Sequence, residues 1–128
     1  MTICTSGDNL ITKLSSTGWL TNLHIAIEAY NYFIEHGTHK HIFKEKEIEV
    51  HYCDLTDDNV KGWCEQCDDN HWLVTIHNDL DIAEHYRTLF HEFQHVIQDI
   101  FGLINEEKRE DQAYHIEKIM YNEMCASS

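Results

Sequence analysis

Apolar residues recur at two different periods along the chain, and the change of period divides it into helices and strands. Residues 18–36 repeat at the spacing of one helix face, and Gly37 is the expected end of that helix. The expected apolar positions are Leu20, Leu23, Ile27, Tyr30 and Ile34. Glu47–Cys53 and His71–His77 instead alternate strictly, which is typical of half-buried strands, and residues 59–66 are a weaker strand candidate.

Two further helices are expected in the last third of the chain. The first runs from about Asp81 to Phe101 and ends at Gly102, and the second runs from about Glu106 to Met124. The apolar face of the first helix comprises Leu89, Phe93, Val96, Ile97 and Ile100. Because the turn between the two helices is short, the second should return antiparallel beside the first. One helix, two or three strands and two helices together predict a small α+β domain.

Length and charge narrow the class of protein. The chain has 128 residues, so we expect a flexible segment over residues 1–17, which are polar and small, and a single domain over residues 18–128. A net charge of −14 disfavours nucleic acid and anionic membranes as partners. With no secretory signal, no membrane-spanning apolar run and five cysteines, we expect an intracellular, cytoplasmic protein with reduced thiols.

Cys64 and Cys67 form a CxxC, for which two thiols in a strand or hairpin are favoured over a metal or redox site.

An HExxH sequence, His91–His95, lies inside the expected long helix. Positions four residues apart face the same side of a helix, so both imidazoles can bind one zinc ion. Glu92 borders the histidine pair and can act as general base toward a zinc-activated water. The helical wheel places the two histidines opposite the apolar face, together with Glu84 and Thr88.

Composition supplies a competing interpretation of this motif, and the last helix supplies a test of it. Eleven histidines give a chance HExxH odds of roughly one in ten, and two surface histidines would then need no metal. A catalytic zinc site needs a third protein ligand. Counted from the turn, Glu110 lies nearly level with His95 and flanks the apolar stripe of the last helix. Asp111 points outward, and Glu117 lies farther along, where it can orient a ligand.

The segment HEFQHVIQ followed by Glu110–Ala113 resembles the HExxH…ExxA pattern of gluzincin-type zinc metallopeptidases. More narrowly, residues 60–120 are similar to short phage-encoded, metallopeptidase-like proteins with a minimal zincin fold. The resemblance implies one zinc ion bound by His91, His95 and Glu110, with Glu92 as general base and a peptide or protein as substrate. It also extends the expected location to the cytoplasm of a virus-infected host cell.

Two features of a peptidase site are open at the level of sequence. The oxyanion needs a donor besides the metal, and Tyr114 is the first candidate, with His77 and His115 as alternatives. An extended substrate needs a sheet edge, and the strand His71–His77 directly precedes the motif helix. For the strand by itself, a core strand with His71 and His77 at its ends is the favoured interpretation.

We therefore interpret the sequence as a zinc-dependent metallopeptidase of minimal zincin architecture. It would hydrolyse peptide bonds through a zinc-activated water, with Glu92 as general base. The alternative is a non-catalytic zinc-binding protein in which the metal staples the last two helices together. A third interpretation, a histidine-rich helical interaction module without metal, requires the chance occurrence of the motif.

Overall fold

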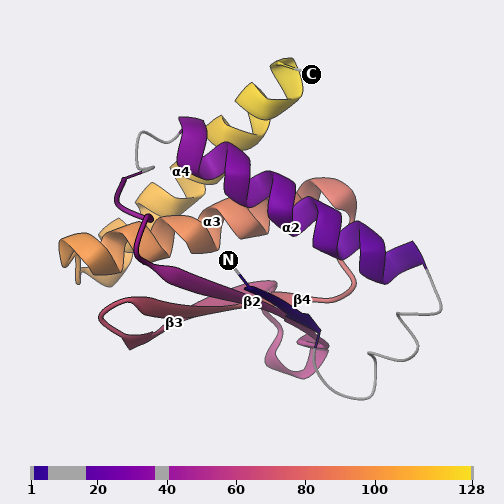
Figure 1. Cartoon of the computed structure of the whole chain (residues 1–128), viewed down its shortest axis with the longest axis horizontal. Coiled ribbons are helices and arrows are strands. Elements are labelled where there is room, and N and C mark those ends of the chain that lie inside the picture. Colours follow the sequence, from indigo (N-terminus) through magenta and orange to yellow (C-terminus); the bar gives the residue numbers. More distant parts are fainter. Residues whose placement is uncertain (1, 6–16, 37–40, 128) are drawn as a thin grey trace.

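The computed structural model describes residues 2–5, 17–36 and 41–127, and it has an α+β architecture (Figure 1). The predicted order of a helix, a small sheet and then two helices is confirmed. In chain order the elements are β1 (Thr2–Thr5), α2 (Thr17–His36), β2 (Glu47–Cys53), the 3₁₀ helix η1 (Thr56–Asp58), β3 (Gly62–Asp68), β4 (His71–His77), α3 (Ile82–Phe101) and α4 (Glu106–Ala126). The expected helix end at Gly37 lies outside the described residues. Of the helices that are described, none is both long and apolar enough to cross a membrane.

The sheet has four strands in the described part of the chain, where two or three were expected. Their order is β1-β2-β4-β3; the first three run parallel, and β3 runs antiparallel beside β4. The prediction of a flexible segment is wrong for Thr2–Thr5, which forms β1, while residues 6–16 lie outside the described residues. Four residues are too few to show a period of two, and β1 is placed by backbone pairing with β2.

The sheet edge beside α3 belongs to β3. Strand β4 lies between β2 and β3, so His71–His77 is an internal strand, as the favoured interpretation held, and it does not offer the sheet edge considered for a substrate. A hairpin connects the two strands, and local alternation cannot tell which of them has a second neighbour. At Gly62, a Cβ atom would lie 2.7 Å from the carbonyl oxygen of Thr75 and 3.1 Å from Cγ2 of Thr88 on α3. Glycine therefore lets the edge strand lie close against the helix that carries the HExxH sequence.

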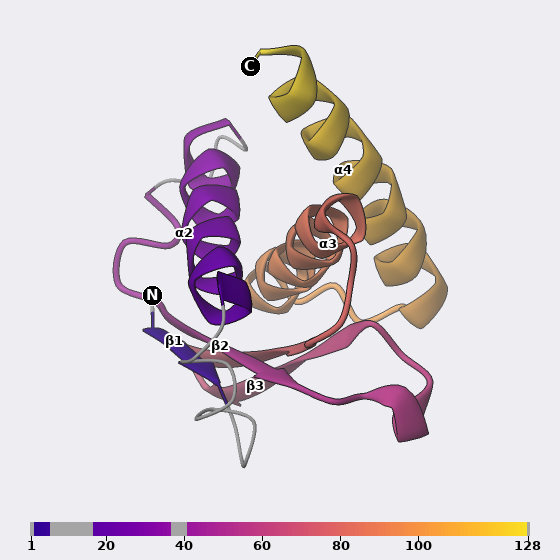
Figure 2. The same cartoon turned by 90° about the vertical axis from the view of Figure 1, so that its right-hand side faces the viewer.

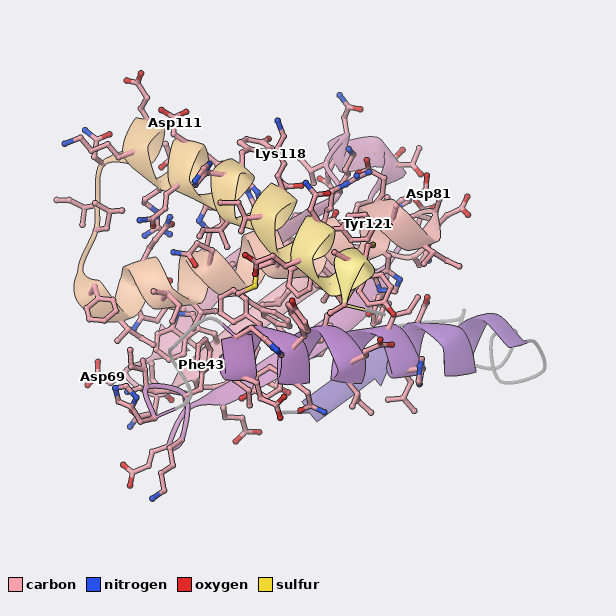
Figure 3. The ribbon with its side chains drawn as sticks, turned by 90° about the horizontal axis from the view of Figure 1, so that it is seen from above. Phe43, Asp69, Asp81, Asp111, Lys118 and Tyr121 are labelled. Atoms are coloured by element: carbon pink, nitrogen blue, oxygen red, sulfur yellow. The ribbon has the colours of Figure 1, made fainter. Side chains whose placement is uncertain are left out.

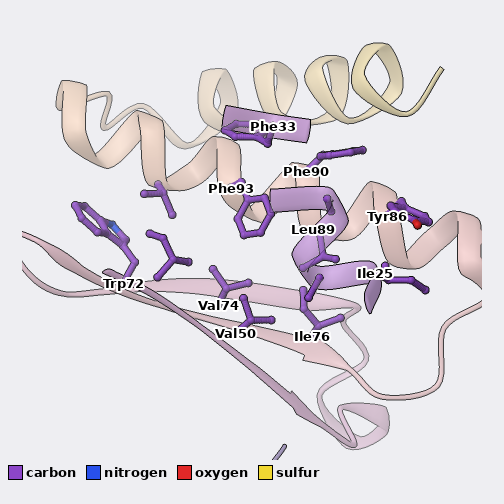
Figure 4. Close-up of a cluster of buried hydrophobic side chains, with 14 of the residues drawn as sticks. Ile25, Phe33, Val50, Trp72, Val74, Ile76, Tyr86, Leu89, Phe90 and Phe93 are labelled. Atoms are coloured by element: carbon purple, nitrogen blue, oxygen red, sulfur yellow. The ribbon is translucent and has the colours of Figure 1, made fainter. Parts of the chain in front are cut away.

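Helices α2, α3 and α4 all lie on the same side of the sheet, and α3 lies between α2 and α4, which packs mainly on α3 (Figure 2). Val50, Val74 and Ile76 point from the sheet toward this layer and are fully buried (Figure 4). They belong to one core cluster with Leu89 and Phe93 of α3. The apolar face predicted for α3 is therefore confirmed.

Helix α2 faces the core through a different side from the one predicted. Ala26, Ala29 and Phe33 are fully buried, whereas Ile27, one of the expected core positions, is 43% exposed. The other predicted positions are partly buried at Leu23, Tyr30 and Ile34, and the Leu20 side chain is outside the described part. Apolar residues are so frequent in this helix that periodicity alone does not choose a face, and the two alanines allow close contact with the core.

Helices α3 and α4 start at capping side chains and run antiparallel. Asp81 caps α3 and Asn105 caps α4, each by accepting a hydrogen bond from a backbone N–H of the first turn. Gly102 ends α3 with φ at 75°, the left-handed conformation that favours glycine. Figure 3 shows α4 returning along α3, from Asp111 to Tyr121 near the start of α3.

Candidate metal centre

The structure brings together the three residues that were predicted as metal ligands. His91 and His95 lie one turn apart on α3, and Glu110 comes from α4. One oxygen of the Glu110 carboxylate lies 3.1 Å from Nε2 of His91, and the other lies 3.2 Å from Nε2 of His95. A ligand atom from each residue lies within 4.8 Å of the other two, and the described residues contain no second group of this kind.

The second ring nitrogen of each histidine is held by another side chain. Nδ1 of His91 donates to the Glu117 carboxylate at 3.0 Å, and Nδ1 of His95 donates to the side-chain oxygen of Gln98 at 2.7 Å. Both partners accept at oxygen, so the tautomer with its proton on Nδ1 satisfies these contacts and leaves Nε2, which faces Glu110, available to bind an ion. Such partners orient the metal-binding histidines of proteins. Glu117 thus contacts His91 as its predicted orienting role requires, and Gln98 is a residue that sequence reasoning missed.

Burial and hydrogen bonding shift the pKa values of the two imidazoles in opposite directions. Burial would lower the pKa of His91, but the hydrogen bond to Glu117 and nearby carboxylate charges outweigh it and raise that pKa above its ordinary value. Burial lowers the pKa of His95, and the hydrogen bond to Gln98 does not offset this. His95 is therefore held in the neutral form that binds a metal, and His91 lies in a field that attracts a cation.

The donor set fits a zinc ion. Two imidazole nitrogens and one carboxylate are the protein ligands of many catalytic zinc sites, which keep a further position open. With bonds of about 2.0–2.2 Å, a tetrahedral ion separates its ligand atoms by roughly 3.3–3.5 Å. Different oxygens of Glu110 lie 3.1 Å and 3.2 Å from the two histidines, and one ligand atom from each residue lies within 4.8 Å of the others, which is compatible with one ion between them. The same donor set also suits mononuclear iron(II). The groups around the ligands must therefore indicate whether the site carries out hydrolysis or the oxygen chemistry of iron.

Glu92 is the neighbouring group that favours hydrolysis. Glu92 is only 5% exposed. Burial, together with the charges of Glu110 and Glu117, raises the pKa of its carboxyl group to about 7. It lines the same cavity as the predicted ligands and is not one of the three residues that could hold the ion. A carboxyl group with this pKa can take up and release a proton near neutral pH, which a general base requires.

The centre opens into a cavity of about 870 Å³ lined by residues of β3, α3 and α4. Tyr114 lines it and lies edge-on to His91, with the ring centroids 4.6 Å apart. The other two candidate oxyanion donors, His77 and His115, do not line it, and His77 instead accepts a hydrogen bond from the Leu55 amide at 3.0 Å. Of the three candidates, the structure places Tyr114 alone beside the predicted ligands.

Three glutamines connect α3 to α4 beside His95. Gln98 is 2% exposed, and its Nε2 donates to the backbone oxygen of Arg109 and to the side-chain oxygen of Gln112, both at 2.9 Å. Gln94 donates to the same Gln112 oxygen at 3.0 Å. The spacing of Gln94 and Gln98, four residues apart on the side of the helix that carries the histidines, is the signal that could have indicated them.

Cys64 and Cys67 are both free thiols, as the favoured interpretation of the CxxC held. Cys64 is partly buried and lines the cavity, whereas Cys67 is exposed. Desolvation raises the pKa of Cys64 well above its usual value, which disfavours the thiolate that a redox or metal site would need.

Comparisons of the chain with models of protein families, with curated proteins and with solved structures give no match. The resemblance to gluzincins therefore rests on the motif residues. To these the structure adds their placement around one cavity.

Proposed function

We propose that the protein is a zinc-dependent metallopeptidase of the gluzincin type, with one zinc ion held by His91, His95 and Glu110. The observation that carries the proposal is the convergence of both Nε2 atoms on the Glu110 carboxylate, with the buried Glu92 carboxyl group lining the same cavity. Burying a carboxylate costs folding free energy unless it is compensated. A catalytic role accounts for that cost, whereas a structural metal site does not require Glu92.

The chain's own residues supply the proton transfers of the reaction. Bound zinc provides a Lewis acid that polarises the substrate carbonyl and makes water a better nucleophile. Glu92 takes the proton from the attacking water and delivers it to the leaving amine. In the metal-free protein burial raises its pKa to about 7, so the group exchanges a proton near neutral pH. Glu117 and Gln98 hold the two imidazoles in place.

The walls of the cavity suit an extended peptide. Within the described part of the chain, β3 pairs with β4 on one side and leaves its other edge open, and its residues Gly62 and Cys64 line the cavity. A peptide backbone can pair with that edge and bring a carbonyl group to the centre. We assign the Tyr114 hydroxyl, on the residue beside His91, as the donor to the oxyanion.

A non-catalytic zinc site that joins α3 to α4 is the second candidate function. It is favoured by the origin of the ligands, since Glu110 comes from α4 and both histidines come from α3. The contact of Glu117 with His91 joins the same two helices. The two candidates differ at Glu92, which a structural site does not need.

The deciding experiment measures metal content and peptide cleavage on the same preparations. Wild type is expected to bind about one zinc ion per chain and to cleave unfolded or short peptides near neutral pH. Glu92→Gln is expected to keep the zinc and to lose about 10²- to 10⁴-fold in cleavage rate, the usual contribution of a general base. The His91→Ala, His95→Ala double variant is the control and should bind no zinc.

Each alternative has its own result in this experiment. Equal zinc in wild type and the double variant would exclude this centre, and iron in place of zinc would overturn the metal assignment. If zinc-loaded wild type cleaves nothing in a broad peptide library, the non-catalytic zinc site becomes the favoured function. A Glu92→Gln protein as active as wild type would overturn the mechanism.

A further inference from the structure

The positive charges of the chain are concentrated around the cavity. Nine Lys and Arg residues stand against 23 Asp and Glu in the whole chain, yet four of the nine line the cavity. These four are Lys61, Arg87, Arg109 and Lys118. Five glutamates also line it, namely Glu84, Glu92, Glu106, Glu110 and Glu117. An anionic group can therefore approach only where the positive charges outnumber the carboxylates locally.

Two of the four share a single carboxylate. Nζ of Lys61 lies 2.7 Å from one oxygen of Glu84, and the Arg87 guanidinium lies 2.9 Å from the other. The three side chains therefore keep a net positive charge. Arg109, by contrast, is paired with Asp99 at 2.8 Å, toward the turn between α3 and α4.

Lys118 adds a third positive charge to the lining of the same cavity. It lies on α4 between Glu117, which contacts His91, and Tyr121, whose ring lies 5.2 Å from the Arg87 guanidinium carbon. Lys118 is therefore level with the turn of α3 that connects Arg87 to His91, and Figure 3 shows it on α4 between Asp111 and Tyr121. Its side chain is exposed.

One carboxylate near the metal centre also acts on this group, since the charge of Glu117 contributes to the raised pKa of Lys61. Three cations against Glu84 and Glu117 still leave a net positive charge. Glu110 faces both histidines, and Glu117 accepts the hydrogen bond of His91. Glu92 is buried within α3. Lys61, Arg87 and Lys118 therefore remain able to contact an anionic group of a substrate in the cavity.

We propose that Lys61, Arg87 and Lys118, the cationic end of the cavity, bind a carboxylate of the peptide substrate close to the bond that is cleaved. This inference rests on the proposed function and adds a substrate class to it. Lys and Arg N–H groups form short, charge-assisted hydrogen bonds with carboxylates, and the guanidinium group can do so in a bidentate manner. The carboxylate can belong to an Asp or Glu side chain or to a free C terminus, because the recognition chemistry is the same.

The test measures binding, so its outcome does not depend on cleavage. Zinc-loaded Glu92→Gln protein is titrated calorimetrically with two sets of short peptides. In the first set, amidated at the C terminus, one Glu is placed at each position in turn and compared with Gln. In the second set, the side chains are neutral and a free C terminus is compared with an amidated one. In at least one set, we expect the peptide that carries the extra carboxylate to bind about fivefold more tightly than its neutral counterpart. This difference in affinity should decrease at high salt.

Charge reversal at Lys118 locates the effect. Lys118→Glu should abolish the preference for the anionic peptide and favour a peptide with Lys in place of Glu. Lys108→Glu is the matched control, since Lys108 is exposed on the same helix and does not line the cavity. Preference in the first set identifies a side-chain carboxylate, and preference in the second set a terminal one.

The inference is overturned by equal binding within both sets, or by equal effects of the Lys118 and Lys108 variants. Failure of the proposed function gives a separate result, because zinc-loaded wild type would then cleave none of these peptides whatever their affinity.

Discussion

At the scale of single residues, each histidine of the centre is held at both ring nitrogens. His91 lies between Glu110 and Glu117, and His95 lies between Glu110 and Gln98. Glu110 faces the Nε2 atoms of both rings, whereas Glu117 and Gln98 each contact one Nδ1. These positions separate the residue that would bind the ion from the residues that orient its ligands.

Substitution of the acidic residues of α4 should therefore weaken zinc binding in a fixed order. Glu110→Ala removes a ligand and should weaken affinity by more than about 100-fold, while Glu117→Ala frees one imidazole and should cost about tenfold. Asp111→Ala is the control and should change nothing, because Asp111 is exposed. Competition with a chromophoric chelator measures all three affinities. Equal losses for Glu110→Ala and Asp111→Ala would contradict the arrangement.

The buried carboxyl group of Glu92 gives the metal-free protein a characteristic pH dependence. An acid whose pKa is raised from 4.5 to about 7 binds its proton more tightly in the folded state. The stability that this proton provides is complete below about 4.5 and is lost as the pH rises through about 7. Relative to Glu92→Gln, chelator-treated wild type should lose on the order of 2–3 kcal/mol of unfolding free energy between about pH 4.5 and pH 8.

Denaturant unfolding of both proteins at several pH values measures this difference. Glu92→Gln has no titrating group at this position, so its stability is the baseline against which wild type is compared. The variant should be the more stable of the two proteins at pH values above about 7. A difference between the two proteins that stays constant with pH would show that folding does not raise the pKa of Glu92.

At the scale of elements, α3 is enclosed on two sides. One face packs on the sheet through Leu89 and Phe93, and the other holds the centre against β3 and α4. Side-chain amides connect α3 to α4 where the two helices meet, since Gln98 contacts both the backbone of Arg109 and the side chain of Gln112. The packing of this helix pair therefore sets the position of His95.

Gln98→Ala should weaken zinc binding and stability together. The substitution leaves Nδ1 of His95 without its partner and removes two hydrogen bonds to α4, so we expect about tenfold weaker zinc binding and a loss of about 1–3 kcal/mol in the metal-free protein. Gln112→Ala is the matched control, because it removes a contact of Gln98 but none of His95. The two variants are compared by chelator competition and by denaturant unfolding. Equal zinc affinity in both would show that Gln98 does not orient His95.

At the scale of the whole molecule, α4 is attached to the rest of the domain by both apolar and polar contacts. Its buried residues are Ala113 and Met120, and Ile116, Tyr121 and Met124 pack against the core while partly exposed. The other contacts of α4 with α3 include the pairs of His91 with Glu110 and of Arg109 with Asp99. An ion that joins the two helices should therefore stabilise the fold as well as serve the proposed chemistry.

Zinc is thus expected to raise the melting temperature of the protein. At a free concentration about a thousandfold above Kd, binding adds about 4 kcal/mol, which corresponds to roughly 10–15 °C for a domain of this size. Differential scanning calorimetry with zinc and with chelator measures the shift. The His91→Ala, His95→Ala double variant should show none, and a shift as large as that of wild type would assign the zinc to another site.

The sequence by itself determined the features that depend on neighbours along the chain. Strict alternation predicted the bounds of β2 and β4, and Gly102 ends α3 where the sequence predicted. Helix geometry alone places His91 and His95 on one face, because four residues are close to one turn. Counting residues from the turn also singled out Glu110.

Only the tertiary structure decided the features that depend on what covers a surface. Periodicity did not show that β3 lies at the edge beside α3, that Thr2–Thr5 extends the sheet, or that α2 buries Ala26 rather than Ile27. Burial also sets the pKa of Glu92, and the approach of α4 places Gln98 against His95. Local patterns encode the conformation of a segment, but contacts between segments decide which atoms lose water, and desolvation sets both packing and charge.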